Sequence, residues 1–317
     1  MNINKRLIIR LLPVIMAGCS GENSVTDDAP ITPTPDPPAK QLKINISTTV
    51  ESAVSNAAET TTWASRATDS SFEYGDFIGL FVVNHNADGT PGTLMPEGNH
   101  VDNMKFTYNG TWTPASPLYW KDDKTHADFY AYYRYQNITS TTDLPISIYT
   151  DQYDESNYKA NDFMLGSALN VTPSENAVNI TLKHMMSLII IKVEPGNGFT
   201  TESLAQANIS VKINNIKTKA KLNMATATLT AESDPMSINP MKTDEGYKAL
   251  VPPQSVSYGD LITITIDGKD FNLKKAFKFV GGKIHKFTVT PTKTSNGINV
   301  NISQWENDDT DNGGNAE

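Results

Sequence analysis

The chain has 317 residues, a formal net charge of −9 and a sequence pI near 5.1. An acidic chain without a basic patch cannot displace counterions from phosphates, so nucleic acid is excluded as an expected partner. A single cysteine excludes an intrachain disulfide and a cysteine-based metal site. The length allows two domains of ordinary size, each with its own core.

The first 19 residues have the organisation of an export signal. Three basic residues precede an apolar segment that is too short to span a bilayer, and small residues lead to Cys19. The residues Met16, Ala17, Gly18 and Cys19 resemble a bacterial lipobox, in which the signal peptide is removed and the new N-terminal cysteine is acylated. We therefore predict a signal peptide at 1–18 and lipidation at Cys19, which would hold the protein on a membrane. The alternative is a stray thiol in an ordinary signal peptide.

Two segments of different character follow the signal. Residues 19–40 are rich in Ser, Asp, Thr and Pro, cannot bury a core, and are predicted to form a disordered, extended tether. In residues 41–49, Leu42, Ile44 and Ile46 alternate with polar residues, which predicts a half-buried strand.

Arg66 is the only arginine between residues 11 and 133, and small polar residues surround it. Exposure in such a segment is what an arginine-directed protease needs. We predict a cut between Arg66 and Ala67, which would detach the strand at 41–49 together with the lipid. The alternative is that Arg66 is an ordinary loop arginine.

Strand patterns dominate the rest of the chain, and no long segment has a helical period, although 201–207 could form one or two turns. The apolar run 77–83 predicts a strand covered on both faces. A loop-like segment at 172–176 predicts a boundary between β-sandwich domains at 41–175 and 176–317. The other predicted strands are 105–108 and 111–113 around an Asn-Gly turn, 128–135, 178–184, 188–193, 209–213, 221–230, 247–251, 261–266, 271–279, 284–290 and 298–302.

Chemical motifs are scarce. No nucleophile motif, phosphate loop or carboxylate pair stands out, and the five histidines lack metal-ligand spacing. We predict no enzyme activity, no catalytic residue, no metal and no cofactor, and His184 is expected to be a core histidine with a partner.

Four aromatic side chains could form a sugar-stacking platform, although core or hairpin packing is their commoner role: Trp112, Trp120, Tyr130 and Tyr132.

Several short motifs, in their order along residues 40–306, resemble the fimbrillin family of Gram-negative anaerobes. They are Phe72-x-x-Gly75-Asp76-x-Ile78-Gly79-x-Phe81, Leu118-Tyr119-Trp120, Asp128-Phe129-x-Ala131-Tyr132-Tyr133-x-Tyr135, Leu182-x-His184, Gly282-Lys283-x-x-x-Phe287-Thr288-Val289 and Ile302-x-x-Trp305. The resemblance implies two tandem transthyretin-like β-sandwiches, export as an outer-membrane lipoprotein, and a place in a surface fimbria. It also implies trimming by an Arg-specific protease, which it places at Arg66, and polymerisation by strand exchange.

Strand exchange makes physical sense for this sequence. Removing residues 41–49 would leave an unpaired sheet edge, which is a template for β-augmentation by another subunit. The donor-strand candidate is 297–303, where Ile298, Val300 and Ile302 alternate with polar residues like the leader strand. Head-to-tail donation is heterologous and builds an open filament.

Two other roles stay open at the level of sequence. One is a subunit that keeps its lipid as a fimbrial anchor or forms the tip as an adhesin. The other is a surface glycan-binding lipoprotein, and in either case a host glycan or protein receptor is a candidate partner.

Overall fold

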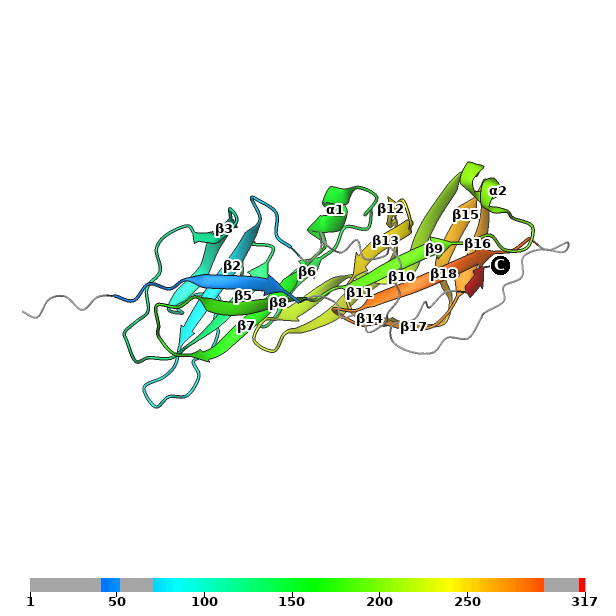
Figure 1. Ribbon diagram of the computed structural model, residues 1–317. Helices are drawn as coiled ribbons and strands as arrows, with labels where there is room; N and C mark the ends of the chain where they lie inside the picture. The colour runs from blue at the N-terminus through cyan, green and yellow to red at the C-terminus, as the bar shows by residue number, and fades with distance from the viewer. Residues whose placement is uncertain (1–40, 52–70, 294–313, 317) are drawn as a thin grey trace, which may run out of the picture. The chain divides into compact units, whose positions relative to one another are not determined.

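The computed structural model describes residues 41–51, 71–293 and 314–316 (Figure 1). This part of the chain is nearly all β, as predicted, and residues from Gln41 onward form one unit. Its helices are the short segments α1 (Glu155–Ala160) and α2 (Thr201–Gln206), the second at the place where one or two helical turns were predicted. None of the helices described here is long and apolar enough to cross a membrane.

The first sheet has, within the described residues, seven strands in the order β1-β8-β7-β5-β2-β3-β4. β1 and β8 are parallel, whereas the other neighbours are antiparallel. The bounds are β1 (Ile46–Val50), β8 (Val178–His184), β7 (Met164–Val171), β5 (Ala127–Tyr133), β2 (Phe77–Asn84), β3 (Val101–Tyr108) and β4 (Trp112–Pro114).

The remaining strands form three further sheets among the described residues. One has the order β11-β10-β15-β16, with β6 also paired to β10; another has the order β12-β13-β9-β18-β19; the third is the pair β14-β17. The bounds are β6 (Leu144–Ser147), β9 (Ser187–Val193), β10 (Ile209–Asn223), β11 (Thr228–Ile238), β12 (Met241–Thr243), β13 (Gly246–Val251), β14 (Gln254–Val256), β15 (Asp260–Ile266), β16 (Lys269–Lys274), β17 (Phe277–Phe279), β18 (Ile284–Pro291) and β19 (Gly314–Ala316).

Buried side chains form two hydrophobic clusters on opposite faces of the first sheet. In β2, Ile78, Leu80 and Val82 face the smaller cluster, while Phe81 and Val83 face the larger one. The larger cluster continues between the sheets that follow in the chain. The prediction that 77–83 is covered on both faces is therefore confirmed.

The boundary predicted between residues 175 and 176 falls between two strands of one sheet. β8 lies beyond that boundary, yet it pairs with β7 and with β1. In the other direction, β6 pairs with β10. His184 is therefore the last residue of the first sheet along the chain, and the division into two domains stays a prediction.

Two predicted elements differ in detail from the structure. The predicted strand 221–230 contains the turn between β10 and β11, where Ala227 has a left-handed φ of 51°. The predicted strand 271–279 is divided between β16 and β17, which lie in different sheets. The sequence also did not predict α1, whose buried residue is Tyr158.

Candidate functional site

The N-terminal segment 41–51, blue in Figure 1, forms an edge of the first sheet and has one apolar face. Ile44 is 1% exposed and Ile46 is 9% exposed, and both belong to the smaller cluster. Leu42 and Val50 are partly buried and pack against the same cluster. The predicted period-2 pattern is confirmed, and it extends to Thr48 and Val50.

Backbone hydrogen bonds hold this segment to two distant parts of the chain. The Ile44 N–H donates to the Leu118 carbonyl at 2.9 Å, and the Trp120 N–H donates to the Leu42 carbonyl at 2.9 Å. From Ile46 onward, the segment pairs in parallel with β8, from Ile46 opposite Val178 to Val50 opposite Leu182. The segment thus bridges β8 and residues 118–120.

A side-chain contact joins the two ends of the sheet. β1 and β4 are the first and last strands in the sheet order, yet the Trp112 Nε1–H donates to Thr48 Oγ1 at 2.6 Å. The sheet must therefore curl around the smaller cluster, and the N-terminal segment closes the gap between β8 and the region of β4 and residues 118–120.

Phe72 anchors the chain where the described residues resume at Ser71. Its ring packs edge-on against Trp112, with centroids 4.9 Å apart, and lies 5.8 Å from Tyr108 and 5.9 Å from Tyr133. Such aromatic pairs contribute about 0.5–1.5 kcal/mol each beyond burial. One indole, that of Trp112, thus contacts both the N-terminal strand and the residue that leads into β2.

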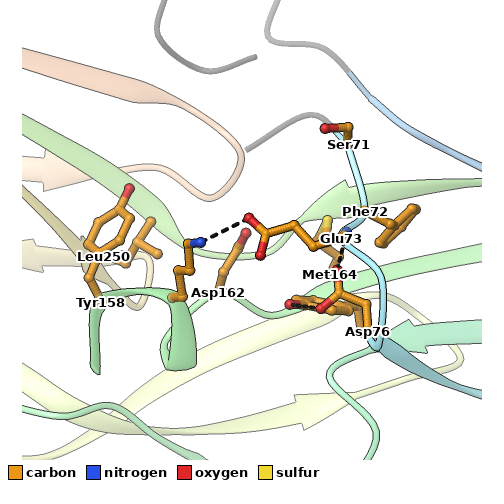
Figure 2. A pocket seen from close by; sticks show the side chains of 10 residues that line it. Ser71, Phe72, Glu73, Asp76, Tyr158, Asp162, Met164 and Leu250 are labelled. Atoms are coloured by element: carbon orange, nitrogen blue, oxygen red, sulfur yellow. Dashed lines mark hydrogen bonds and ion pairs between the residues drawn. The ribbon is translucent and has the colours of Figure 1, made fainter. Parts of the chain in front are cut away.

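A cavity of about 80 Å³ lies beside this anchor (Figure 2). Among the residues that line it, Lys159 Nζ lies 2.9 Å from Glu73 Oε1, and the Tyr133 hydroxyl donates to Asp76 Oδ1 at 3.1 Å. Burial raises the pKa of Tyr133, and the hydrogen bonds to Glu73 and Glu155 raise the pKa of Lys159. Ligand pockets usually measure about 300–1,000 Å³, so the space suits a few waters better than a sugar.

The aromatic side chains considered for sugar stacking do not form an open platform. Tyr132 is fully buried, Trp120 is 3% exposed and Tyr130 is 9% exposed. Trp112 is partly buried in the contacts described above. Packing therefore accounts for these four side chains.

The histidine predicted to lie in the core with a partner is His184, and its Nδ1 lies 2.8 Å from Asp162 Oδ1. In the part of the chain that the structure describes, no three or more His, Cys, Asp or Glu side chains are grouped to hold a metal ion.

The structure places only some of the predicted site residues. Leu42, Ile44 and Ile46 lie in the sheet edge described above. The signal peptide, the tether, the lipidation site, the processing site and the donor-strand candidate lie outside the described residues: Cys19, Arg66, Ala67, Ile298, Val300 and Ile302. Sequence reasoning did not find the contacts of Thr48, Phe72 and Trp112, and the continued alternation after Ile46 was the signal available for Thr48.

The fold is similar to that of solved proteins from Bacteroides species. It is similar to the crystal structure of "a putative cell adhesion protein" from Bacteroides uniformis, with a TM-score of 0.59, 21% identity, and coverage of 83% of this chain and 96% of that chain. It is also similar to "a fimbrial protein" from Bacteroides ovatus, with a TM-score of 0.52, 23% identity, and coverage of 78% of this chain and 48% of that one.

The sequence matches the Fimbrillin-like family over residues 65–305, so the chain belongs to that family, as predicted. A relative named "Putative fimbrium subunit Fim1C", from Bacteroides uniformis, is 27% identical over 261 residues, which are 76% of this chain and 80% of the relative. Another, "Putative fimbrium tip subunit Fim1C" from Bacteroides ovatus, is 32% identical over 136 residues, 38% of this chain. The matched part spans 24% of that relative's length.

Proposed function

We propose that this chain is a structural subunit of a surface fimbria, exported as a lipoprotein and polymerised by strand exchange after cleavage behind Arg66. The observation that carries the proposal is the position of the N-terminal segment, which closes an apolar cluster from the sheet edge. Membership of the fimbrillin-like family supports the same role. We propose no enzymatic activity.

The packing of the N-terminal segment suits a removable strand. Burial of two isoleucines, Ile44 and Ile46, contributes about 3–6 kcal/mol. While the chain is intact, this is an intramolecular contact with a high effective concentration. After cleavage behind Arg66, the same contact becomes bimolecular. A binding free energy of ~4 kcal/mol, within that range, corresponds to a Kd near 1 mM. The cut segment would then dissociate.

Its departure would leave a space that we call the β1 groove, lined by the smaller cluster between β8 and residues 118–120. The groove would present backbone groups that now bond to the segment, including the Val178 N–H, which donates to the Asn45 carbonyl at 2.9 Å. An apolar groove beside an unpaired strand edge accepts an added strand from another subunit. Because the donor and the groove are different segments of the chain, the contact is heterologous and builds a filament.

N-terminal sequencing of the protein recovered from the cell surface tests the proposal. We expect a mature chain that begins at Ala67 and a polymer ladder on electrophoresis. An Arg66→Ala variant should keep its leader and stay monomeric, whereas Arg134→Ala, at an exposed arginine in the described part of the chain, should be processed normally. Polymers of a subunit that still carries its leader would contradict the proposal.

A tip or anchor subunit is the second candidate, favoured by the name of the Bacteroides ovatus relative, a fimbrium tip subunit. In that role the chain would accept or donate a strand at one end only. A mature N-terminus blocked by acylation at Cys19, in protein found at one end of each fimbria, would support the anchor. Immunogold labelling at tips alone would support the adhesin.

A further inference from the structure

The indole of Trp112 is a fixed hydrogen-bond donor at the edge of the β1 groove. Its Nε1–H donates to Thr48 Oγ1, and the rings of Phe72 and Tyr108, with centroids 4.9 Å and 5.1 Å away, hold its orientation. Thr48 occupies the inward-facing position that follows Ile44 and Ile46. The groove therefore presents a hydrogen-bond donor at one defined position along the bound strand, that of Thr48.

The occupant must match this donor as well as the apolar surface. The inward-facing residues of β1 and of the segment before it are, in chain order, Leu42, Ile44, Ile46 and Thr48, so a hydroxyl follows three aliphatic side chains. Leaving a partly buried N–H without an acceptor weakens association by about tenfold. An aliphatic side chain at the Thr48 position is therefore disfavoured, although it would suit the positions before it.

The C-terminal segment has this pattern in the same chain direction. Its alternate residues are Ile298, Val300, Ile302 and Gln304, which correspond to Leu42, Ile44, Ile46 and Thr48. The outward residues agree as well, since Asn-Ile-Ser occurs at 45–47 and again at 301–303. A shift of two residues would set Ile302 against the indole N–H and would put Gln304 at the apolar position of Val50.

We propose that Trp112 sets the register in which residues 298–304 of a second copy enter the β1 groove. The Gln304 side-chain oxygen accepts from the Trp112 Nε1–H in place of Thr48, and the added strand runs parallel to β8 as β1 does. This inference rests on the proposed strand exchange and adds to it a specificity-determining residue and a register. The register can be wrong while the proposed strand exchange is right.

Disulfide trapping tests the register, using the full chain with Cys19→Ser, cut behind Arg66. Ser47 lies opposite Asn179 in the sheet, so Ser303 of the second copy should take that place. Asn179→Cys with Ser303→Cys should give a disulfide-linked ladder. Thr181→Cys with Ser303→Cys is the off-register control, because Thr181 lies opposite Thr49. All of these positions in β1 and β8 are exposed.

The outcomes separate the two proposals. Linkage through Asn179 supports the register. Linkage through Thr181 instead, or polymers without linkage in either pair, overturns the register while polymerisation stands. Failure of the trimmed chain to polymerise at all overturns the proposed function and this inference together.

A double-mutant cycle tests the role of Trp112. Trp112→Phe keeps an aromatic ring but removes the N–H, and its unfolding is compared with wild type to establish that it folds. Gln304→Leu should weaken polymerisation about tenfold in the wild type but change it little in Trp112→Phe. Asn299→Leu, at an outward position, is the matched control. An equal effect of Gln304→Leu in both backgrounds overturns the proposal.

Discussion

Replacing Ile44 with alanine tests whether apolar packing holds the N-terminal segment in place. Ile44 is 1% exposed within the smaller cluster, so truncation loses apolar burial and leaves a cavity. The expected loss is about 2–5 kcal/mol in the free energy of unfolding. Asn45→Ala is the matched control, because Asn45 is exposed and its hydrogen bond to β8 comes from the backbone. Substitutions of exposed residues usually change stability by about 0.5 kcal/mol or less.

Urea unfolding of the full chain measures the difference between these two variants. After cleavage behind Arg66, the Ile44→Ala leader should also leave the groove more readily. A change of ~2 kcal/mol, the low end of the range, corresponds to about 30-fold in the dissociation constant of the cut leader. Equal losses of stability in Ile44→Ala and Asn45→Ala would refute the reasoning, because packing would then not distinguish an inward from an outward side chain.

Three further predictions concern the first sheet. Burial raises the pKa of Tyr132 in the folded protein. The stability that its protonated hydroxyl contributes is therefore full below the unfolded pKa near 10 and is lost as pH rises toward the folded pKa. Between pH 9 and 11, the free energy of unfolding in urea should fall less steeply for Tyr132→Phe than for wild type, by up to about 1.4 kcal/mol per pH unit. Gly79→Ala should cost about 1–3 kcal/mol in thermal unfolding, because an added Cβ would overlap the Tyr132 ring, whereas Gly259→Ala, whose Cβ would make only an ordinary contact with Asn215, should differ little from wild type. Phe72→Ala should cost about 3 kcal/mol or more and shift Trp112 fluorescence, while Tyr74→Ala, at a side chain 80% exposed, should do neither; matching spectra would contradict the aromatic anchor.

Several elements could be predicted because their signals are local. The alternation around Ile44 identifies an inward face, and the continuous apolar run in β2 predicts burial on both sides. The Asn109-Gly110 turn predicts the hairpin of β3 and β4, in which Tyr108 lies opposite Trp112. Each pattern depends only on the two-residue period of an extended chain or on the φ preferences of a turn.

Other elements depend on pairing with distant strands, which no local sequence pattern predicts. α1 is too short for its period to be recognised, and β6 becomes a strand because β10 offers it an edge. β8 carries an alternating pattern that suits either side of the predicted boundary. Only the tertiary structure assigns it to β1 and β7.

The sequence by itself determined the family, the all-β fold class and the side of the N-terminal strand that faces inward. The tertiary structure decided what that side faces: a parallel neighbour, β8, whose paired residues lie 132 positions away, and an indole donor 64 residues away. The physical reason is that alternation is a property of one backbone, whereas pairing and side-chain hydrogen bonds depend on which distant edge and which buried surface the folded chain brings beside it.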